Sequence, residues 1–206
     1  MRWWVIIGLL IWTNSVWSQQ HIGDFGLQTG DILFQDFDSG LSEAIKEISH
    51  SEFSHVGVVL VIDHKTWVLE AVSPVRLTEL DSWIARNDRN FYVAKRLKDA
   101  DSRWTTEKQD ELIKEGRKYL GKPYDIRFEW SNDALYCSEL VWKVYYEVLG
   151  IRVGEIQRLK ELDMSTQVVQ ETLFRLYGNE IPYEEMVVSP QAILDCPLLI
   201  ELPVSN

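Results

Sequence analysis

The run FSHVGVVLVI at residues 53–62 constrains the fold more than any other stretch, because β-branched residues dominate it. Such a run favours a central β-strand. Asp63, His64 and Lys65 then form a turn that leads into TWVLEAV at 66–72, a second largely apolar run. The two runs are predicted to pair as a hairpin, so we expect the chain to fold around an antiparallel sheet.

Further strands are predicted at 32–34, in NFYVAKRL at 90–97 and in PLLIEL at 197–202. Apolar residues at helical spacing predict helices at 39–49, 105–120, 137–149 and 166–177, with short helices at 80–85 and 190–194. Ser39 or Ser42 is available to cap the first of these helices. Because strands and helices are segregated rather than strictly alternating, the predicted fold class is α+β with a mainly antiparallel sheet.

The stretch ALYCSELVWKVYYEVLG at 134–150 places Cys137 at the start of a predicted helix that ends at Gly150. Unpaired backbone N–H groups and the positive end of the helix dipole favour a thiolate at such a position. Cys137 is therefore either a small core residue or a nucleophile that needs a base. Ser138 and Glu139, which follow it, are expected to serve the dipole and the free N–H groups.

Histidine is the usual base for a cysteine nucleophile, and the chain has four histidines. His21 lies near the N-terminus, His50 ends a predicted helix and His64 sits in the hairpin turn. His55 differs, because it opens the most hydrophobic strand and is held there by the core. On this pattern alone, a histidine at a strand end is more often structural than catalytic.

Glu70 interrupts the second strand of the hairpin, between Leu69 and Ala71. A carboxylate in a buried strand is costly unless it has a partner. One interpretation is an edge strand whose glutamate faces water. The other is that Glu70 and His55 are cross-strand neighbours, so that Glu70 accepts a hydrogen bond from the imidazole and orients it.

The N-terminus has the layout of a secretory signal peptide, with Arg2, an apolar run from Trp3 to Trp12 and a cleavage site near Ser18. The apolar run is shorter than the ~20 residues that span a bilayer, so no permanent membrane anchor is expected. We therefore predict removal of residues 1–18 and export to the periplasm or beyond. Residues 19–206 are predicted to form a single domain.

The chain carries a formal net charge of −11, so it lacks the excess positive charge with which proteins bind nucleic acid. The oligomeric state is not determined by such features. Cys137 and Cys196 are the only cysteines. Export makes a disulfide between them chemically possible, but pairing cannot be deduced from sequence.

Several motifs in a fixed order resemble one known family: GDILF, SHVGVVL, LEAV, GKPYD and YCSELVW. They are similar to the permuted papain-like amidases of the YiiX/YaeF type. These are relatives of NlpC-like cell-wall peptidases and of lecithin:retinol acyltransferase. The similarity extends from about Leu27 to Leu149, and it implies a circularly permuted papain-like fold in which the sheet packs against helices, including the one that carries Cys137.

The resemblance also implies roles for individual residues. His55 would be the base, Glu70 the orienting group and Cys137 the nucleophile, in the permuted order histidine, acidic residue, cysteine. Tyr124 of GKPYD matches a tyrosine beside the cysteine of NlpC-like enzymes, where it would help to bind the oxyanion. A Pro-Tyr pair in a loop is otherwise often only a packed turn.

These residues predict an exported cysteine hydrolase that works by acyl transfer on an amide bond. The expected substrate is a peptide, a cell-wall fragment or an N-acylated small molecule. No cofactor is expected and no metal, because one cysteine with one nearby histidine is too few ligands for a zinc site. The alternatives are a lipid acyl hydrolase or acyltransferase using the same site, and a catalytically silent binding module.

Overall fold

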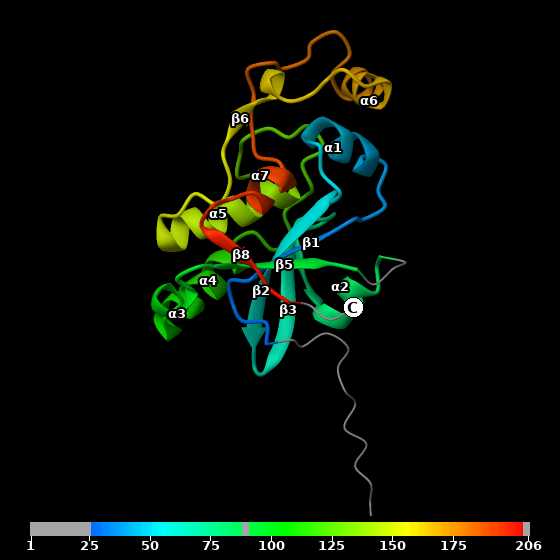
Figure 1. Cartoon of the computed structure of the whole chain (residues 1–206). Helices are drawn as coiled ribbons and strands as arrows, with labels where there is room; N and C mark the ends of the chain where they lie inside the picture. Colours follow the sequence, from blue (N-terminus) through cyan, green and yellow to red (C-terminus); the bar gives the residue numbers. More distant parts are fainter. Residues whose placement is uncertain (1–25, 88–90, 204–206) are drawn as a thin grey trace, which may run out of the picture.

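A computed structural model of the chain describes residues 26–87 and 91–203. Its centre is a six-stranded antiparallel sheet in the order β4-β3-β2-β1-β5-β8 (Figure 1). The strands are β1 (Ile32–Gln35), β2 (His55–Ile62), β3 (Lys65–Glu70), β4 (Arg76–Glu79), β5 (Val93–Leu97) and β8 (Leu199–Glu201). A two-stranded sheet joins β6 (Gln157–Arg158) to β7 (Met186–Val187). The predicted α+β class is confirmed.

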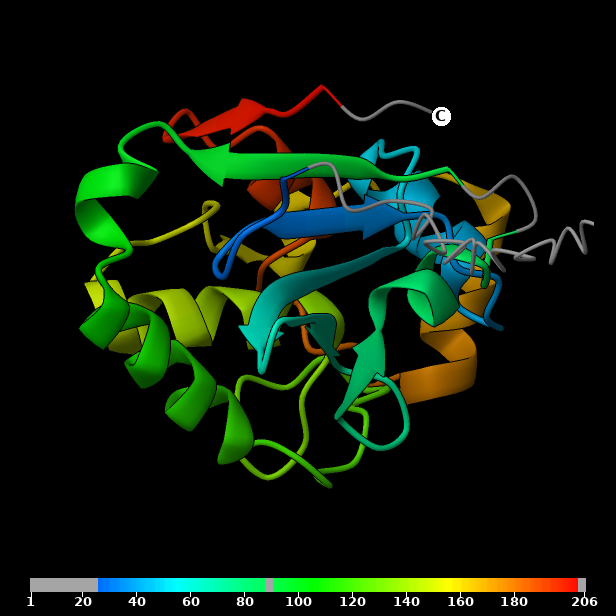
Figure 2. The same cartoon turned by 90° about the horizontal axis from the view of Figure 1, so that it is seen from below.

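The helices of the described part lie around this sheet. They are α1 (Ser42–Ser49), α2 (Leu80–Ile84), α3 (Ala100–Arg103), α4 (Thr106–Arg117), α5 (Cys137–Leu149), α6 (Gln167–Tyr177), α7 (Pro190–Leu194) and the 3₁₀ turn Leu159–Glu161. Figure 2 shows α4 and α5 running beside each other under the sheet. Figure 1 shows α1 and α6 together at one end of the molecule.

The β2–β3 hairpin forms where the apolar runs predicted it, with Ile62 paired to Lys65 and Val58 to Leu69. The turn consists of Asp63 and His64, both at positive φ. Two residues in this conformation match the right-handed twist of the flanking strands. Lys65, which the sequence analysis placed in the turn, instead begins β3.

Alternation along β2 gives the sheet two different faces. Val56, Val58 and Leu60 belong to the main core, which also contains residues of α4 and α5. Val59 belongs to a smaller cluster on the other face, with Trp83 of α2. Because side chains two residues apart share a face, His55 lies on the same face of β2 as Val59.

Several predicted boundaries were wrong. The helix predicted at 39–49 begins at Ser42, and its N-cap is Leu41, without a side-chain cap. The Ser42 hydroxyl instead bonds Phe37 O and accepts the Ser39 N–H, which ties the preceding loop. The helix predicted at 105–120 is shorter, from 106 to 117, and the strand predicted from residue 90 begins at Val93.

The short elements β4, α3, β6 and β7 were not predicted from the sequence. Among the described residues, no helix combines the length and the apolar character that crossing a membrane requires. The predicted signal peptide at 1–18 and His21 lie outside the described residues.

Candidate active site

Cys137 is the first residue of α5, and it is buried, with 2% of its surface exposed. Two groups of the first turn hold this helix end. Glu139 Oε2 accepts the Tyr136 N–H at 3.4 Å, which satisfies a free donor of the helix terminus. Ser138 Oγ donates to Val188 O at 2.7 Å. The helix start is therefore fixed both within α5 and to the segment before α7.

The thiol of Cys137 meets the imidazole of His55 where the N-terminus of α5 approaches the start of β2. Burial raises the pKa of the thiol, but the hydrogen bond and the charge of His55 outweigh burial and lower it from its usual value. The backbone N–H groups of Val56 and Ser138 lower the thiol pKa further. This environment favours the thiolate relative to an unperturbed thiol.

His55 responds in the opposite sense. Burial lowers the pKa of the imidazole, but hydrogen bonds and charges from Cys137 and Glu70 raise it to about 9. A lowered thiol pKa and a raised imidazole pKa together favour a thiolate–imidazolium pair.

The Nε2 atom of His55 lies 2.7 Å from Oε2 of Glu70. This contact leaves Nδ1 as the ring nitrogen for Cys137. The two residues are not directly opposite in the strand register, because continuing the pairing of Val58 with Leu69 sets Glu70 opposite Gly57. His55 is the diagonal neighbour, two positions along on the same face. His55 and Glu70 are therefore in contact, as predicted from the hairpin turn. They are diagonal neighbours, however, and not residues directly opposite each other in the two strands.

Gly57 leaves the space that this diagonal contact needs. A Cβ atom at this position would lie 2.5 Å from Val68 Cγ1 and 3.0 Å from Leu69 O. It would also lie 3.6 Å from Glu70 Cβ. Only glycine therefore fits between the base and its carboxylate partner without a shift of β3.

Glu70 is fully buried, and β3 lies between β2 and β4, so the interpretation of a glutamate facing water from an edge strand is wrong. Its carboxylate accepts both guanidinium N–H groups of Arg86, at 2.6 and 2.8 Å. It also accepts Thr78 Oγ1–H at 2.5 Å and Trp83 Nε1–H at 3.1 Å. We call His55, Glu70, Thr78, Trp83 and Arg86 the Glu70 cluster.

These donors determine the charge of Glu70. Burial raises the pKa of the carboxyl, but hydrogen bonds from His55 and Arg86, with that of Thr78, hold it well below its usual range. The forked contact with Arg86 is the strongest geometry available to a carboxylate. Arg86 in turn lies over the Phe37 ring, 5.0 Å from its centroid. The carboxylate is therefore ionised and fixed in orientation.

Tyr124 approaches Cys137 from the loop after α4. The loop runs beside the residues that precede α5, where Asp125 N–H donates to Leu135 O and Leu135 N–H to Pro123 O, both at 3.1 Å. Burial and the neighbouring Cys137 raise the pKa of the Tyr124 phenol well above its usual range. The phenol therefore keeps its proton and can donate a hydrogen bond beside the thiol.

Thr78, Trp83 and Arg86 were not predicted from the sequence. The sequence does contain a partial indication of these partners. A buried glutamate needs cationic or N–H donors, and the short helix predicted at 80–85 ends next to Arg86. Gln35 was also missed. It is fully buried opposite His55, and neither its amide oxygen nor its nitrogen has a hydrogen-bond partner in the part of the chain that the structure describes.

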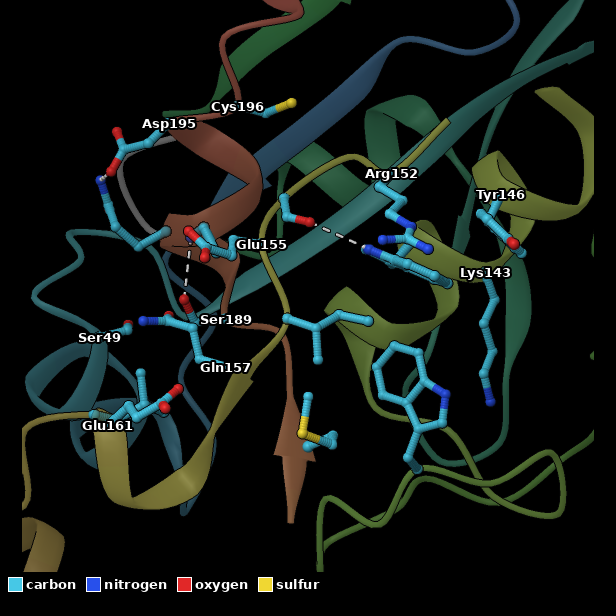
Figure 3. Close-up of a pocket in the computed structure, with 18 of the residues that line it drawn as sticks. Ser49, Lys143, Tyr146, Arg152, Glu155, Gln157, Glu161, Ser189, Asp195 and Cys196 are labelled. Atoms are coloured by element: carbon cyan, nitrogen blue, oxygen red, sulfur yellow. Dashed lines mark hydrogen bonds between the residues drawn. The ribbon is translucent and has the colours of Figure 1, made fainter. Parts of the chain in front are cut away.

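Other candidates lie apart from this site. Cys196 is buried and, like Cys137, is a free thiol. His50 is largely exposed, with Nε2 3.2 Å from Asp163 Oδ2, and His64 occupies the hairpin turn. Cys196 lines a large open cleft of about 1500 Å³ on another side of α5 and α7, to which Cys137 does not contribute (Figure 3).

A cysteine at a helix start, a strand histidine and a buried glutamate, in the chain order histidine, glutamate, cysteine, define a papain-like protein of permuted topology. The chain belongs to the family described as permuted papain-like amidase enzyme, YaeF/YiiX, C92 family, whose model matches residues 26–202. It is 49% identical over 172 residues to the uncharacterized protein YiiX of Escherichia coli strain K12. That match covers 84% of each chain.

A solved structure is also similar. The crystal structure of "metalloprotein yiiX" from Escherichia coli O157:H7 superposes with a TM-score of 0.82 at 47% identity. The match covers 86% of this chain and 97% of the other. The family predicted from the ordered motifs is therefore confirmed, and so is the permuted papain-like fold.

Proposed function

We propose that the chain is an exported cysteine hydrolase that cleaves an amide bond by acyl transfer. The observation that carries the proposal is the thiol of Cys137 at a helix start, beside an imidazole whose other nitrogen is bonded to a buried carboxylate. Membership of an amidase family supports the same reaction class.

In the proposed first step, the Cys137 thiolate attacks the carbonyl carbon of the substrate, and the carbonyl oxygen becomes an oxyanion. In this proposal, the Cys137 N–H and the Tyr124 hydroxyl donate to this oxygen. His55 then gives its Nδ1 proton to the amide nitrogen, and the C–N bond breaks. The products of this step are an amine and an acyl-enzyme thioester.

In the second step, neutral His55 takes a proton from a water molecule, and the hydroxide attacks the thioester carbonyl. The C–S bond breaks, the carboxylic acid leaves, and the thiolate–imidazolium pair is restored. Glu70 stays ionised throughout and stabilises the imidazolium. The same residues would cleave an ester, which keeps a lipid acyl hydrolase or acyltransferase as the second candidate.

The solved relative is described as a metalloprotein, which raises the question of a metal site in this chain. Within residues 26–87 and 91–203, no three histidine, cysteine, aspartate or glutamate side chains are grouped so that they could hold a metal ion. The residues present do not fit such a site, and we derive no step through a metal. We expect hydrolysis to persist after treatment with a chelator.

The experiment is mass spectrometry of products after incubation with cell-wall peptide fragments and N-acyl amino acids. Wild type is expected to cleave an amide bond in one of them, and Cys137→Ala to cleave none. Cys196→Ala is the matched control, because it removes the other buried thiol, and it should keep activity. Cleavage by Cys137→Ala would refute the proposal. Export is tested separately, by N-terminal sequencing of the mature protein, which should begin near residue 19.

A further inference from the structure

Cys137 lies in the wall of a cavity of about 80 Å³ that is distinct from the cleft of Figure 3. The cavity lies between α1, α6, the N-terminus of α5 and the segment 187–190. Most of its lining is aliphatic or aromatic: Leu41, Ala44, Ile45, Ile48, Phe128, Leu159, Leu162, Val169, Leu173, Leu176, Val187, Val188 and Pro190. We call it the apolar cavity.

Apart from Cys137 itself, no lining residue of the apolar cavity carries a charge. Its polar side chains are Ser49, Ser138, Ser189, Thr172 and two tyrosines, and most of their hydroxyls bond neighbouring backbone. Ser49 Oγ donates to Ile45 O at 2.6 Å, and Ser189 Oγ accepts the Ala192 N–H at 3.0 Å. The cavity therefore offers a ligand van der Waals contact and the removal of apolar surface from water.

The cleft of Figure 3 has the opposite character. Lys143, Arg152, Glu155, Glu161 and Asp195 are among the residues that line it. Ile48, Ser49, Leu162 and Ser189 line both spaces and form the wall between them. The two spaces differ in the feature that matters for the proposed chemistry, since only the apolar cavity includes Cys137, whereas the cleft includes Cys196.

The cover of the apolar cavity is part of the fold. Val169 and Leu173 of α6 are buried in a small core with Leu159, against which Ile48 of α1 packs. The Asp163 N–H donates to Ile48 O at 3.2 Å. Arg175, on α6, donates from Nη2 to Gly40 O at 3.1 Å. These contacts hold α6 against α1, so that α6 forms one wall of the space beside Cys137.

We infer that the apolar cavity binds the acyl side of the substrate, and that the substrate carries a short alkyl acyl group. This inference rests on the proposed function, because it places the carbonyl at Cys137 and the alkyl chain under α6. A cavity of ~150 Å³ lined by apolar residues is large enough for benzene, so the smaller one here suits a chain of a few carbons. An apolar amino-acid side chain has the same surface chemistry, but it would bring a polar backbone amide to the cavity mouth.

Hydrolysis of acyl 4-nitroanilides tests the inference. Each methylene moved from water into the cavity is expected to raise kcat/KM about fourfold from acetyl to butanoyl. Leu173→Trp fills the cavity and should abolish this gain, while Leu173→Ala enlarges it and should move the optimum to longer chains. Phe174→Trp is the matched control, because Phe174 is the adjacent α6 residue, is 63% exposed and does not line the cavity.

A second measurement does not depend on hydrolysis. Methyl and butyl methanethiosulfonate transfer an alkylthio group to a thiolate and release methanesulfinate. In the Cys196→Ala background, Cys137 should react faster with the butyl reagent, and Leu173→Trp should remove the difference. Phe174→Trp, outside the cavity, should leave both rates unchanged.

The outcomes separate the two proposals. Chain-dependent labelling without cleavage of any anilide, cell-wall peptide fragment or N-acyl amino acid would keep the cavity assignment and refute the proposed function. Hydrolysis and labelling that are both independent of chain length would keep the function and overturn the cavity assignment. Preferential cleavage of leucyl peptides over butanoyl anilides would also overturn it, since the occupant would then be an amino-acid side chain.

Discussion

The Glu70 cluster and the apolar cavity lie on two sides of Cys137 and are built in opposite ways. In the cluster, one buried carboxylate accepts hydrogen bonds from His55, Thr78, Trp83 and Arg86. In the cavity, uncharged side chains from α1, α6 and the segment before α7 surround an open space. The first region controls charge and orientation, whereas the second offers only shape and apolar surface.

This difference separates what each region contributes. A polar cluster in a low-dielectric site is sensitive to the loss of any one partner, because the remaining buried groups are left unpaired. An apolar cavity tolerates substitution and changes which ligand fits. We therefore expect substitutions in the Glu70 cluster to change the rate of reaction, and substitutions around the cavity to change the choice of substrate.

The largest expected effect is that of Cys137→Ala, which should abolish hydrolysis and leave the protein folded. Cysteine packs as a small apolar residue, so alanine should cost little stability. Activity and thermal unfolding, measured side by side with Cys196→Ala, check this. A loss of ~2 kcal/mol or more in the free energy of unfolding, typical of core truncation, would favour a structural role instead.

Glu70→Gln is expected to lower turnover by ~10- to 10³-fold, because the amide removes the charge that stabilises the imidazolium. A cysteine enzyme should suffer less than the ~10⁴-fold seen when the aspartate of a serine triad becomes asparagine. The measurement is a pH–rate profile of both proteins. Unchanged turnover with unchanged limbs would remove Glu70 from the site and leave a Cys137–His55 dyad.

Arg86→Gln should have a smaller effect in the same direction, because Glu70 keeps Thr78 and Trp83 as donors. Arg86 acts through Glu70 and is a positioning residue. Without the guanidinium, the pKa of Glu70 should rise, but the carboxylate still accepts from His55, Thr78 and Trp83 and stays ionised at neutral pH. Because a positive charge near the imidazolium is lost, the pKa of His55 should rise. The alkaline limb of the pH–rate profile should therefore move to higher pH, and an unshifted limb with reduced turnover would indicate a purely structural loss.

The pH dependence of the wild type follows from His55. The pKa of His55 is raised to about 9, above the usual value of 6.5. Protonation of His55 therefore stabilises the folded state, and this stabilisation is fully present below pH 6.5. This contribution is lost as the pH rises through about 9. Hydrolysis should decline over the same alkaline range, because neutral His55 cannot protonate the leaving amine. A rate that is flat from pH 8 to 10 would contradict the ion-pair assignment.

Glu139→Gln is expected to have the smallest effect on turnover, because Glu139 caps α5 and does not belong to the Glu70 cluster. Burial raises the pKa of its carboxyl to about 7, against the opposing influence of Lys143. Because the carboxyl titrates at a higher pH in the folded state than in the unfolded state, the free energy of unfolding of the wild type should decrease as the pH rises from 4.5 to about 7. The variant lacks this carboxyl and should not show this decrease. Thermal unfolding at pH 5 and pH 8 measures the difference, and a large drop in turnover would give Glu139 a direct role.

Of the Glu70 cluster, His55 and Glu70 could be predicted from the sequence, whereas Thr78, Trp83 and Arg86 could not. A glutamate within an apolar strand and a cysteine before an amphipathic run are local signals, and the hairpin turn brings Glu70 near His55. Arg86 and Trp83 were not predicted, because their role depends on how α2 packs on the sheet, and no local periodicity encodes that packing.

The apolar cavity was not predicted at all, although α6 was. Its walls come from residues as distant in sequence as Leu41, Cys137 and Leu173, and their apolar character is equally consistent with ordinary core. The two-residue strands β6 and β7, which bracket the covering segment, are too short to leave a periodic signal. Their pairing depends on tertiary contacts.

The most direct test of the central claim is rapid-quench mass spectrometry during turnover of butanoyl 4-nitroanilide. The account predicts a transient butanoyl group on the peptide that contains Cys137, which forms and decays at rates consistent with turnover. The same peptide should stay unmodified in Cys137→Ala, and the Cys196 peptide should stay unmodified in the wild type. Turnover with no acylated intermediate, or with the acyl group on another residue, would contradict the account.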